Sequence, residues 1–119
     1  MSEVWAVVGS RGFGNFAEMC IQLQQKIDQY GMPKYIVSGG ASGADTLAEQ
    51  WAALHKMDCV IYEPQWNHHG KKAGAIRNRL IVQAADRVFA FVDGDMTPGT
   101  NITINIAKEF GIPYEVFSS

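Results

Sequence analysis

Short apolar runs alternate along the chain with longer segments in which apolar residues recur every three or four positions. The runs are rich in β-branched and aromatic residues, and they predict five strands, at 4–8, 35–37, 59–62, 87–92 and 114–117. The first and fourth runs are almost continuously apolar. That pattern is typical of strands buried on both faces of a parallel sheet.

The segments between these runs predict four helices, at about 16–30, 46–55, 74–84 and 100–110. Gly31 and Pro33 end the first helix, and the polar segment 63–72 is interpreted as a loop. Strands that alternate with helices favour an α/β fold with right-handed crossovers. We therefore predict a single-domain, Rossmann-like three-layer sandwich around a five-stranded parallel sheet in the order 3-2-1-4-5.

The composition is that of an ordinary globular domain. The chain has 119 residues, of which 47% are apolar and 18% charged, and it carries a net charge of −2. This charge argues against a nucleic-acid partner or an anionic membrane surface. No apolar run approaches the length of a membrane span, and the N-terminus lacks the basic region of a signal peptide. Cys20 and Cys59 lie in a helical and a strand pattern, so buried thiols and a cytoplasmic location are expected.

The most distinctive segment is the glycine-rich turn between the second strand and the second helix. A strand, a turn of small residues and a helix start together present main-chain N–H groups to a phosphate. The alternative is a tight turn with an acidic residue in the first helical turn. Three glycines and two serines within six positions favour the phosphate interpretation. The candidate ligand-binding residues here are Ser38, Gly39, Gly40, Ala41, Gly43, Ala44 and Asp45.

Two further loops are expected at the same edge of the sheet. In open parallel sheets a ligand binds beyond the carboxyl ends of the strands, where the strand order reverses. With the first strand central, that point lies between the loops at 9–14 and 93–101. Both loops are rich in glycine and small polar residues. They add the candidate ligand-binding residues Gly9, Ser10, Arg11, Phe13, Asp93, Gly94, Gly99, Thr100 and Asn101.

Basic side chains supply the candidate anion contacts. Arg11 either holds a phosphate through its bidentate guanidinium or is a solvated surface residue. Arg77 is adjacent to the apolar face of its helix, which favours a site role, whereas Arg79 is assigned to solvent. Asn78 either orients Arg77, contacts sugar hydroxyls or is a surface polar residue. The basic segment 71–87 either steers a polyanion or is an ordinary solvated face.

The polar segment 63–72 holds an aromatic residue and a pair of histidines. Trp66 either stacks on a base or covers part of the core. His68 and His69 are adjacent and have no nearby partner at ligand spacing, so no metal site is predicted. No P-loop occurs, and the first glycine turn differs from the G-x-G-x-x-G pattern of dinucleotide-binding dehydrogenases.

Five motifs occur in a fixed order: Gly9-Ser10-Arg11, the turn 38–45, Ala73–Asn78, Ala85-Asp86 and Pro98-Gly99-Thr100. Together they resemble the SLOG superfamily of Rossmann-like nucleotide-binding proteins, and most of all its YspA-like, YpsA-related branch. That branch includes bacterial and phage proteins of about this length. The superfamily also includes the Lonely Guy phosphoribohydrolases and the DNA-processing protein of natural transformation. The resemblance implies a small-molecule nucleotide as ligand, with no other cofactor expected.

The phosphoribohydrolases carry an arginine on a helix and then a P-G-G-x-G-T-x-x-E motif. Arg77 matches the arginine, but Thr103 stands at the position of the glutamate. A carboxylate there would stabilise the charge that develops on the ribose. Its loss argues against hydrolysis unless another carboxylate replaces it, and the candidates are Asp45, Glu49, Asp93 and Asp95.

Three functions therefore stay open. The first is a module that binds a nucleotide or a nucleotide-derived ligand, either ADP-ribose-like or a nucleoside phosphate, for sensing, sequestration or processing. The second is a phosphoribohydrolase-like enzyme that cleaves a ribosyl bond, and the third is a DNA-binding accessory protein. Thr103 favours the first over the second, and the acidic balance of the chain counts against the third. A homo-oligomer is left open, because many relatives with this fold associate through helices.

Overall fold

The computed structural model describes residues 2–94 and 97–118. Its core is one five-stranded sheet in which every pair of neighbouring strands is parallel. The strand order is β3-β2-β1-β4-β5, which confirms the predicted topology. The strands are β1 (Val4–Gly9), β2 (Tyr35–Ser38), β3 (Cys59–Ile61), β4 (Arg87–Val92) and β5 (Tyr114–Ser118).

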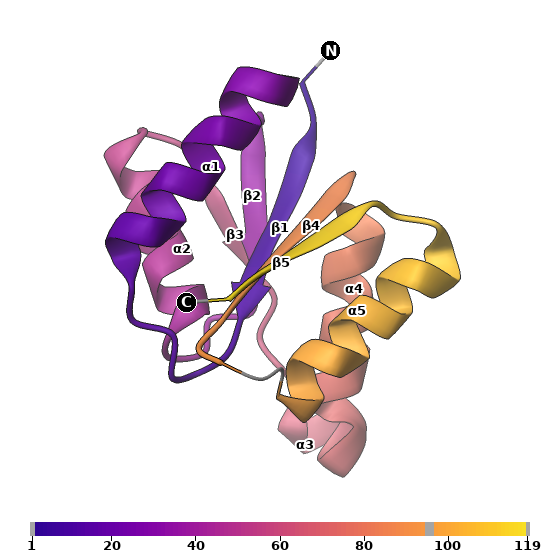
Figure 1. Cartoon of the computed structure of the whole chain (residues 1–119). Helices are drawn as coiled ribbons and strands as arrows, with labels where there is room; N and C mark the ends of the chain where they lie inside the picture. Colours follow the sequence, from indigo (N-terminus) through magenta and orange to yellow (C-terminus); the bar gives the residue numbers. More distant parts are fainter. Residues whose placement is uncertain (1, 95–96, 119) are drawn as a thin grey trace.

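Helices cover both faces of this sheet and make three layers (Figure 1). One face carries α1 (Phe16–Tyr30) and α2 (Ala44–Leu54), and the other carries α4 (Ala73–Ala84) and α5 (Pro98–Phe110). Each helix connects two parallel strands of the same sheet. The three-layer architecture is therefore the one that the alternating sequence pattern predicts.

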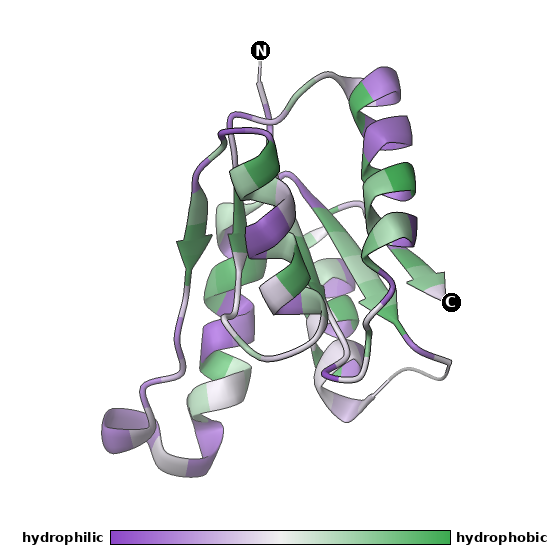
Figure 2. Ribbon diagram, turned by 90° about the vertical axis from the view of Figure 1, so that its left-hand side faces the viewer, coloured by the Kyte–Doolittle hydropathy of each residue, from purple (hydrophilic) through white to green (hydrophobic). Residues whose placement is uncertain are grey.

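Side chains of the central strands alternate between two hydrophobic cores, because successive strand residues point to opposite faces. Trp5 and Val7 of β1 pack with α1 and α2, and the rings of Trp5 and Phe89 meet edge to face at 5.1 Å. Val4, Ala6 and Val8 pack with α4 and α5. Figure 2 shows the strands as mainly hydrophobic and the outward helix turns as mainly hydrophilic. Burial on both faces explains why β1 reads as a continuous apolar run.

The segment 63–72 differs from the loop that its polarity predicts. It forms a short helix, α3 (Trp66–His69), and then a 3₁₀ turn, η1 (Gly70–Lys72). Both elements lie beyond the start of α4 and project from the body of the protein, as Figures 1 and 2 show from two sides. A four-residue helix is too short to show the apolar periodicity on which the sequence prediction depends.

The helix ends place two loops at the carboxyl edge of the sheet. Thr97 caps α5, since its hydroxyl oxygen accepts a hydrogen bond from the Thr100 amide at 3.3 Å, and Pro98 takes the first helical position. Gly43 precedes α2 with a φ of 77°, a value that favours glycine. Both helices therefore begin beside the end of β1. Within the described ranges, no helix is long and apolar enough to cross a membrane.

Candidate functional site

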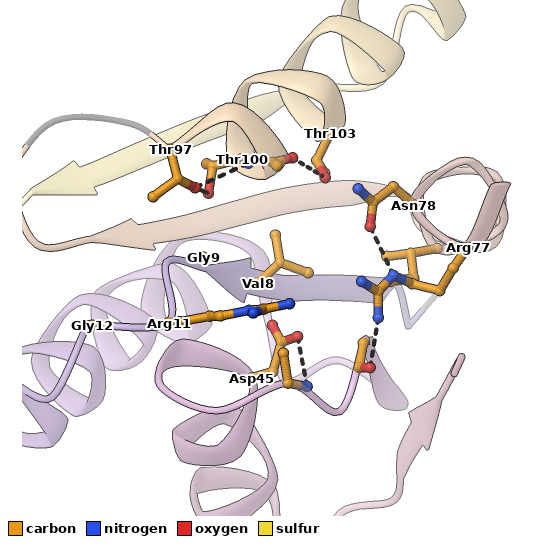
Figure 3. A pocket seen from close by; sticks show the side chains of 14 residues that line it. Val8, Gly9, Arg11, Gly12, Asp45, Arg77, Asn78, Thr97, Thr100 and Thr103 are labelled. Atoms are coloured by element: carbon orange, nitrogen blue, oxygen red, sulfur yellow. Dashed lines mark hydrogen bonds between the residues drawn. The ribbon is translucent and has the colours of Figure 1, made fainter. Parts of the chain in front are cut away.

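A cavity of about 320 Å³ lies at the carboxyl ends of β1 and β2, between the starts of α4 and α5 (Figure 3). It is next to the place where the strand order reverses, which is where ligands bind in open parallel sheets. We call it the main cavity. Its lining comes from four separate segments of the chain and consists of Val8, Gly9, Arg11, Gly12, Gly39, Ala41, Asp45, Arg77, Asn78, Ile81, Thr97, Gly99, Thr100 and Thr103.

A second hollow of about 340 Å³ opens beside the main cavity, towards α3. Four residues, Arg11, Gly39, Ala41 and Arg77, line both spaces. The rest of its lining is Gly40, Glu63, Pro64 and Trp66. The two spaces therefore meet at a shared wall that carries two arginines.

These two arginines approach each other from different elements. Figure 3 shows the Arg11 side chain entering from the loop after β1 and that of Arg77 entering from α4. The Arg77 guanidinium donates from Nη1 to the carbonyl of Gly39 at 2.7 Å and from Nε to Asn78 Oδ1 at 2.9 Å. Among the described residues, neither arginine has a carboxylate within the 4.0 Å of an ion pair.

Two unpaired positive charges at one cavity are electrostatically unfavourable. Burial lowers the pKa of Arg77, and the neighbouring charge of Arg11 lowers it further, while Asp45 acts in the opposite direction. A protein tolerates such a pair where an anion completes the site. The lining of the main cavity thus brings together two guanidiniums and the carboxyl group of Asp45.

Asp45 lies at the base of the glycine turn and is only 6% exposed. Its Oδ2 accepts a hydrogen bond from the Ala41 amide at 3.1 Å, while Oδ1 has no hydrogen-bond partner among the described residues. The nearby Ser38 hydroxyl donates its hydrogen to the carbonyl of Val7 at 2.7 Å. Burial is the main reason that the pKa of Asp45 is raised. The turn therefore holds a carboxylate of its own where the sequence suggested a phosphate.

The start of α5 forms the opposite wall, which is rich in hydroxyl groups. The hydroxyls of Thr97 and Thr100 are 3.0 Å apart, and the Thr103 hydroxyl donates to the carbonyl of Gly99 at 3.2 Å. Figure 3 shows this row on one side and Asp45 on the other, with the side chains of Arg11 and Arg77 between them. Neutral donors and acceptors of this kind suit sugar hydroxyls or phosphate oxygens.

Eleven of the predicted ligand-binding residues line one or both spaces. In the main cavity these are Gly9, Arg11, Gly39, Ala41, Asp45, Arg77, Asn78, Gly99 and Thr100, and in the second hollow Gly40 and Trp66. Trp66 is 56% exposed, so it does not cover the core. Arg79 pairs with Glu109 on the surface at 3.3 Å, as its assignment to solvent predicts.

Other predicted residues serve the fold and do not line either space. Phe13 is 1% exposed and packs against Phe91 with 5.5 Å between ring centroids, so its side chain cannot face a ligand. The large apolar ring finds more buried area beneath α1 and α2 than at the loop surface. Ala44 is fully buried in the same core. None of the residues Gly43, Gly94 and Asn101 lines the main cavity or the second hollow.

Ser10 joins the loops at this edge of the sheet. Its amide donates to the carbonyl of Phe91 at 2.9 Å, its hydroxyl donates to Asp93 Oδ1 at 2.7 Å, and its carbonyl accepts from the Ala44 amide at 3.1 Å. Ser10 is buried, and it connects β1, β4 and α2. Ser10, Ser38 and Asp93 therefore hold the walls of the site in place and do not line it.

Several residues that line the main cavity or the second hollow were not predicted from the sequence. Val8, Gly12, Ile81 and Thr97 line the main cavity, and Glu63 and Pro64 line the second hollow. Only Thr97 carried a usable signal, because a threonine directly before a proline is a typical helix start. Val8 and Ile81 look like ordinary core positions in the sequence, and only the packing of β1 against α4 brings them to the cavity.

The basic segment 71–87 does not form one surface. Arg87 lies at the amino end of β4, the opposite edge of the sheet, where its Nε donates to Glu3 at 2.8 Å. The hypothesis that the whole segment steers a polyanion into the site is therefore wrong. In residues 2–94 and 97–118, no three His, Cys, Asp or Glu side chains are grouped to hold a metal ion.

Comparisons with known proteins agree with this architecture. A model of the YspA, cpYpsA-related SLOG family matches residues 5–69, which include all of β1 except Val4, the glycine turn and α3. The "Gene 61 protein" of Mycobacterium phage D29 is 33% identical, and the match covers 90% of each chain. The X-ray structure of DNA processing protein A (DprA) from Streptococcus pneumoniae superposes with a TM-score of 0.68 at 23% identity. The match covers 99% of this chain and 50% of that one, and at this identity it supports the fold alone.

Proposed function

Because the chain belongs to the YspA, cpYpsA-related SLOG family, we propose that residues 1–119 form one nucleotide-binding domain. Its ligand is a nucleotide or a nucleotide-derived molecule, either ADP-ribose-like or a nucleoside phosphate. It binds in the main cavity, for sensing, sequestration or processing.

The observation that carries this proposal is the convergence of Arg11 and Arg77 on one cavity, where neither arginine forms an ion pair with a carboxylate of the described residues. A phosphate offers each guanidinium two oxygen acceptors, and charge-assisted pairs of this type are the strong hydrogen bonds of proteins. The ligand phosphate would also offset the burial, and the smaller repulsion from Arg11, that lower the pKa of Arg77. No residue of this wall has to move far, since Arg77 is already oriented by Gly39 and Asn78.

The start of α5 adds to the attraction for an anion. A helix of 13 residues directs its positive end at the cavity, where Gly99 leaves the main chain uncovered. The positive end and the two arginines together favour a negatively charged ligand. The hydroxyls of Thr97, Thr100 and Thr103 then suit the sugar of the same ligand.

Binding without turnover fits the site better than hydrolysis. Thr103, which stands where the phosphoribohydrolases have a glutamate, lines the cavity but carries no charge near pH 7. Among the described candidates for a replacement carboxylate, only Asp45 lines the cavity, whereas Glu49 and Asp93 do not. Asp95 lies outside the described residues. Asp45 keeps the phosphoribohydrolase-like function as the second candidate, because a buried carboxylate beside a ribose could stabilise positive charge.

The third function, DNA binding, has less support. A groove for a nucleic-acid strand combines a continuous basic track with stacking platforms. Here Arg87 lies at the far edge of the sheet and Arg79 is paired with Glu109. The match to DNA processing protein A of Streptococcus pneumoniae covers half of that protein at 23% identity, so it supports a shared fold and not a shared ligand.

The test is a thermal-shift and calorimetric titration with AMP, ADP and ADP-ribose, followed by chromatography for free base. We expect at least one nucleotide to bind and to raise the melting temperature by mass action, with no base released. If none of them raises the melting temperature, the nucleotide proposal is wrong. Sustained base release that Asp45→Asn abolishes would establish the hydrolase in place of the binding module.

A further inference from the structure

The main cavity and the second hollow are parts of one cleft. Arg11, Gly39, Ala41 and Arg77 line both, so the two spaces adjoin each other at the arginines. Each space alone is about 320–340 Å³, near the lower end of the roughly 300–1,000 Å³ typical of small-molecule sites. A ligand that fills only one of them leaves the other half of the cleft and much of the arginine surface uncovered.

The half of the cleft in the second hollow suits a flat aromatic group. Trp66 is supported by α4, because a methyl group added at Gly74 would lie 3.7 Å from Trp66 Cη2. Even so, 56% of the residue is exposed, and it lines the hollow beside Pro64. A large exposed aromatic ring that is held from one side and faces a hollow is a stacking surface for a nucleobase.

The half of the cleft in the main cavity suits a neutral group with several hydroxyls. Thr97, Thr100 and Thr103 present hydroxyl oxygens that keep lone pairs for further donors. Asn78 uses its carbonyl oxygen to accept from Arg77, which leaves its NH₂ group free to donate. Hydroxyl and amide groups of this kind pair with the donors and acceptors of a sugar.

The arginines lie between these two halves. Two guanidiniums at the junction match two linked phosphates, each with one negative charge. We propose that the cleft binds a nucleoside 5′-diphosphate whose second phosphate carries a polyhydroxylated group. The base stacks on Trp66, the diphosphate lies between Arg11 and Arg77, and the hydroxylated group contacts the threonines of α5. This inference rests on the proposed function, and it decides between the two ligand types named there.

The experiment compares dissociation constants for ADP-ribose, ADP, AMP and ribose 5-phosphate by calorimetric titration. We expect ADP-ribose to bind at least about tenfold more tightly than AMP, because only ADP-ribose reaches both halves of the cleft. A DNA oligonucleotide of ten thymidines is the fifth ligand. If it binds more tightly than ADP-ribose, the cleft belongs to nucleic acid and the inference is wrong.

Two variants test the orientation. Trp66→Ala should weaken ADP-ribose, ADP and AMP by about fivefold or more, the effect of losing one stacked base, and leave ribose 5-phosphate unchanged. Thr103→Val, which replaces a hydroxyl by a methyl group, should weaken ADP-ribose and leave ADP unchanged. Leu54→Ala is the control for Trp66→Ala, since Leu54 is an exposed apolar residue at the end of α2 and lines neither space. Melting temperatures check that the variants are folded.

The outcomes separate this inference from the proposed function. If AMP binds as tightly as ADP-ribose and Trp66→Ala changes nothing, the two-part cleft is wrong while the nucleotide site stands. If none of the four small molecules binds, the nucleotide site itself is wrong and the inference is wrong with it. The predicted order of affinities together with both variant patterns would establish the two-part ligand.

Discussion

Arg77 offers the sharpest test of the anion site, because a close neighbour in sequence provides a matched control. Arg77 is half-buried, and its guanidinium donates to Gly39 and Asn78 at the junction of the cavity and the hollow. Arg79 lies two positions further along α4, is exposed, and pairs with Glu109 at 3.3 Å. Both substitutions to alanine remove one positive charge from the same helix. Only Arg77→Ala removes a charge that lines the site.

The size of the loss in affinity follows from the type of hydrogen bond that is lost. A hydrogen bond to a charged group contributes about 1.5–3 kcal/mol, so Arg77→Ala should weaken nucleotide binding by roughly 10- to 150-fold. Arg79→Ala should change affinity by less than about twofold, because an exposed charge remote from the ligand acts through screened solvent. Isothermal titration calorimetry at physiological salt measures both values. Equal weakening by the two substitutions would show a diffuse basic surface and refute the specific site.

Stability has to be measured alongside affinity. Gly39 is buried, and Arg77 donates to its carbonyl, so Arg77→Ala leaves that oxygen without its donor. Such a loss costs about 1–3 kcal/mol of folding free energy. Arg77→Lys keeps the charge but not the planar fork, and it should bind with intermediate affinity. If affinity falls from the parent to Arg77→Lys and then to Arg77→Ala, at temperatures where every variant is folded, Arg77 contacts the ligand directly.

Three further predictions concern other residues that the sequence assigned to the site. Gly99→Leu should abolish nucleotide binding without loss of melting temperature, because a Cβ atom added there meets no atom within 4 Å and Gly99 lines the main cavity. Gly14→Leu is the control, since a Cβ atom there is equally unhindered and Gly14 lines neither space. Unchanged binding by Gly99→Leu would show that the ligand avoids the α5 wall. Phe13→Ala should cost about 3–5 kcal/mol of unfolding free energy in a denaturant titration, as for a buried phenylalanine, and a loss of affinity at unchanged stability would instead restore Phe13 as a ligand contact. Burial raises the pKa of Asp45, so the folded state holds the carboxyl proton more tightly than the unfolded state does. Ionisation of Asp45 therefore lowers stability as pH rises from the ordinary value of 3.8 through the raised pKa. Asp45→Asn should gain stability relative to the parent between pH 4 and pH 7, and a relative loss would contradict the raised pKa.

The sequence predicted the fold well because its signals were local and consistent. Continuous apolar runs in β1 and β4 identify strands buried on two faces, and the intervening periodic segments identify helices. The alternation of strands and helices predicted the sheet order that is observed, in which the strand order reverses at β1. The short helix α3 escaped prediction because four residues carry too little periodicity.

The site could be predicted only where chemistry and packing agree. Arg77 was assigned to the site because it borders the apolar face of α4, and it does line the cavity. Phe13 was placed with the ligand because it stands in a glycine-rich loop, yet the buried area available to an aromatic ring draws it into the core. Loop position alone does not say which way a side chain points. That direction depends on contacts between segments far apart in the sequence.

Glycine positions show the same limit. Gly40 has a φ of 74°, and a side chain there would meet Ile61 Cγ2 at 2.8 Å, so its glycine is required by the backbone and the packing around it. A substitution at Gly40 would disturb the turn as well as any ligand. Gly99 has open space around it, so a substitution there tests the ligand alone. The sequence makes the two glycines look equivalent, and only the surrounding atoms separate a structural glycine from one beside open cavity.

Asp45 fixes which side of the cleft receives the phosphate. The glycine turn suggested a phosphate at the start of α2, but the Ala41 amide already donates to Asp45 Oδ2 at 3.1 Å. A phosphate placed against this turn would lose that donor and would face a like-charged carboxylate. The start of α5 offers a positive helix end on the wall opposite Asp45, and Arg11 and Arg77 lie between the two walls (Figure 3). We therefore infer that the phosphate lies on the side of Arg11, Arg77 and α5, and that Asp45 keeps the anion off the turn.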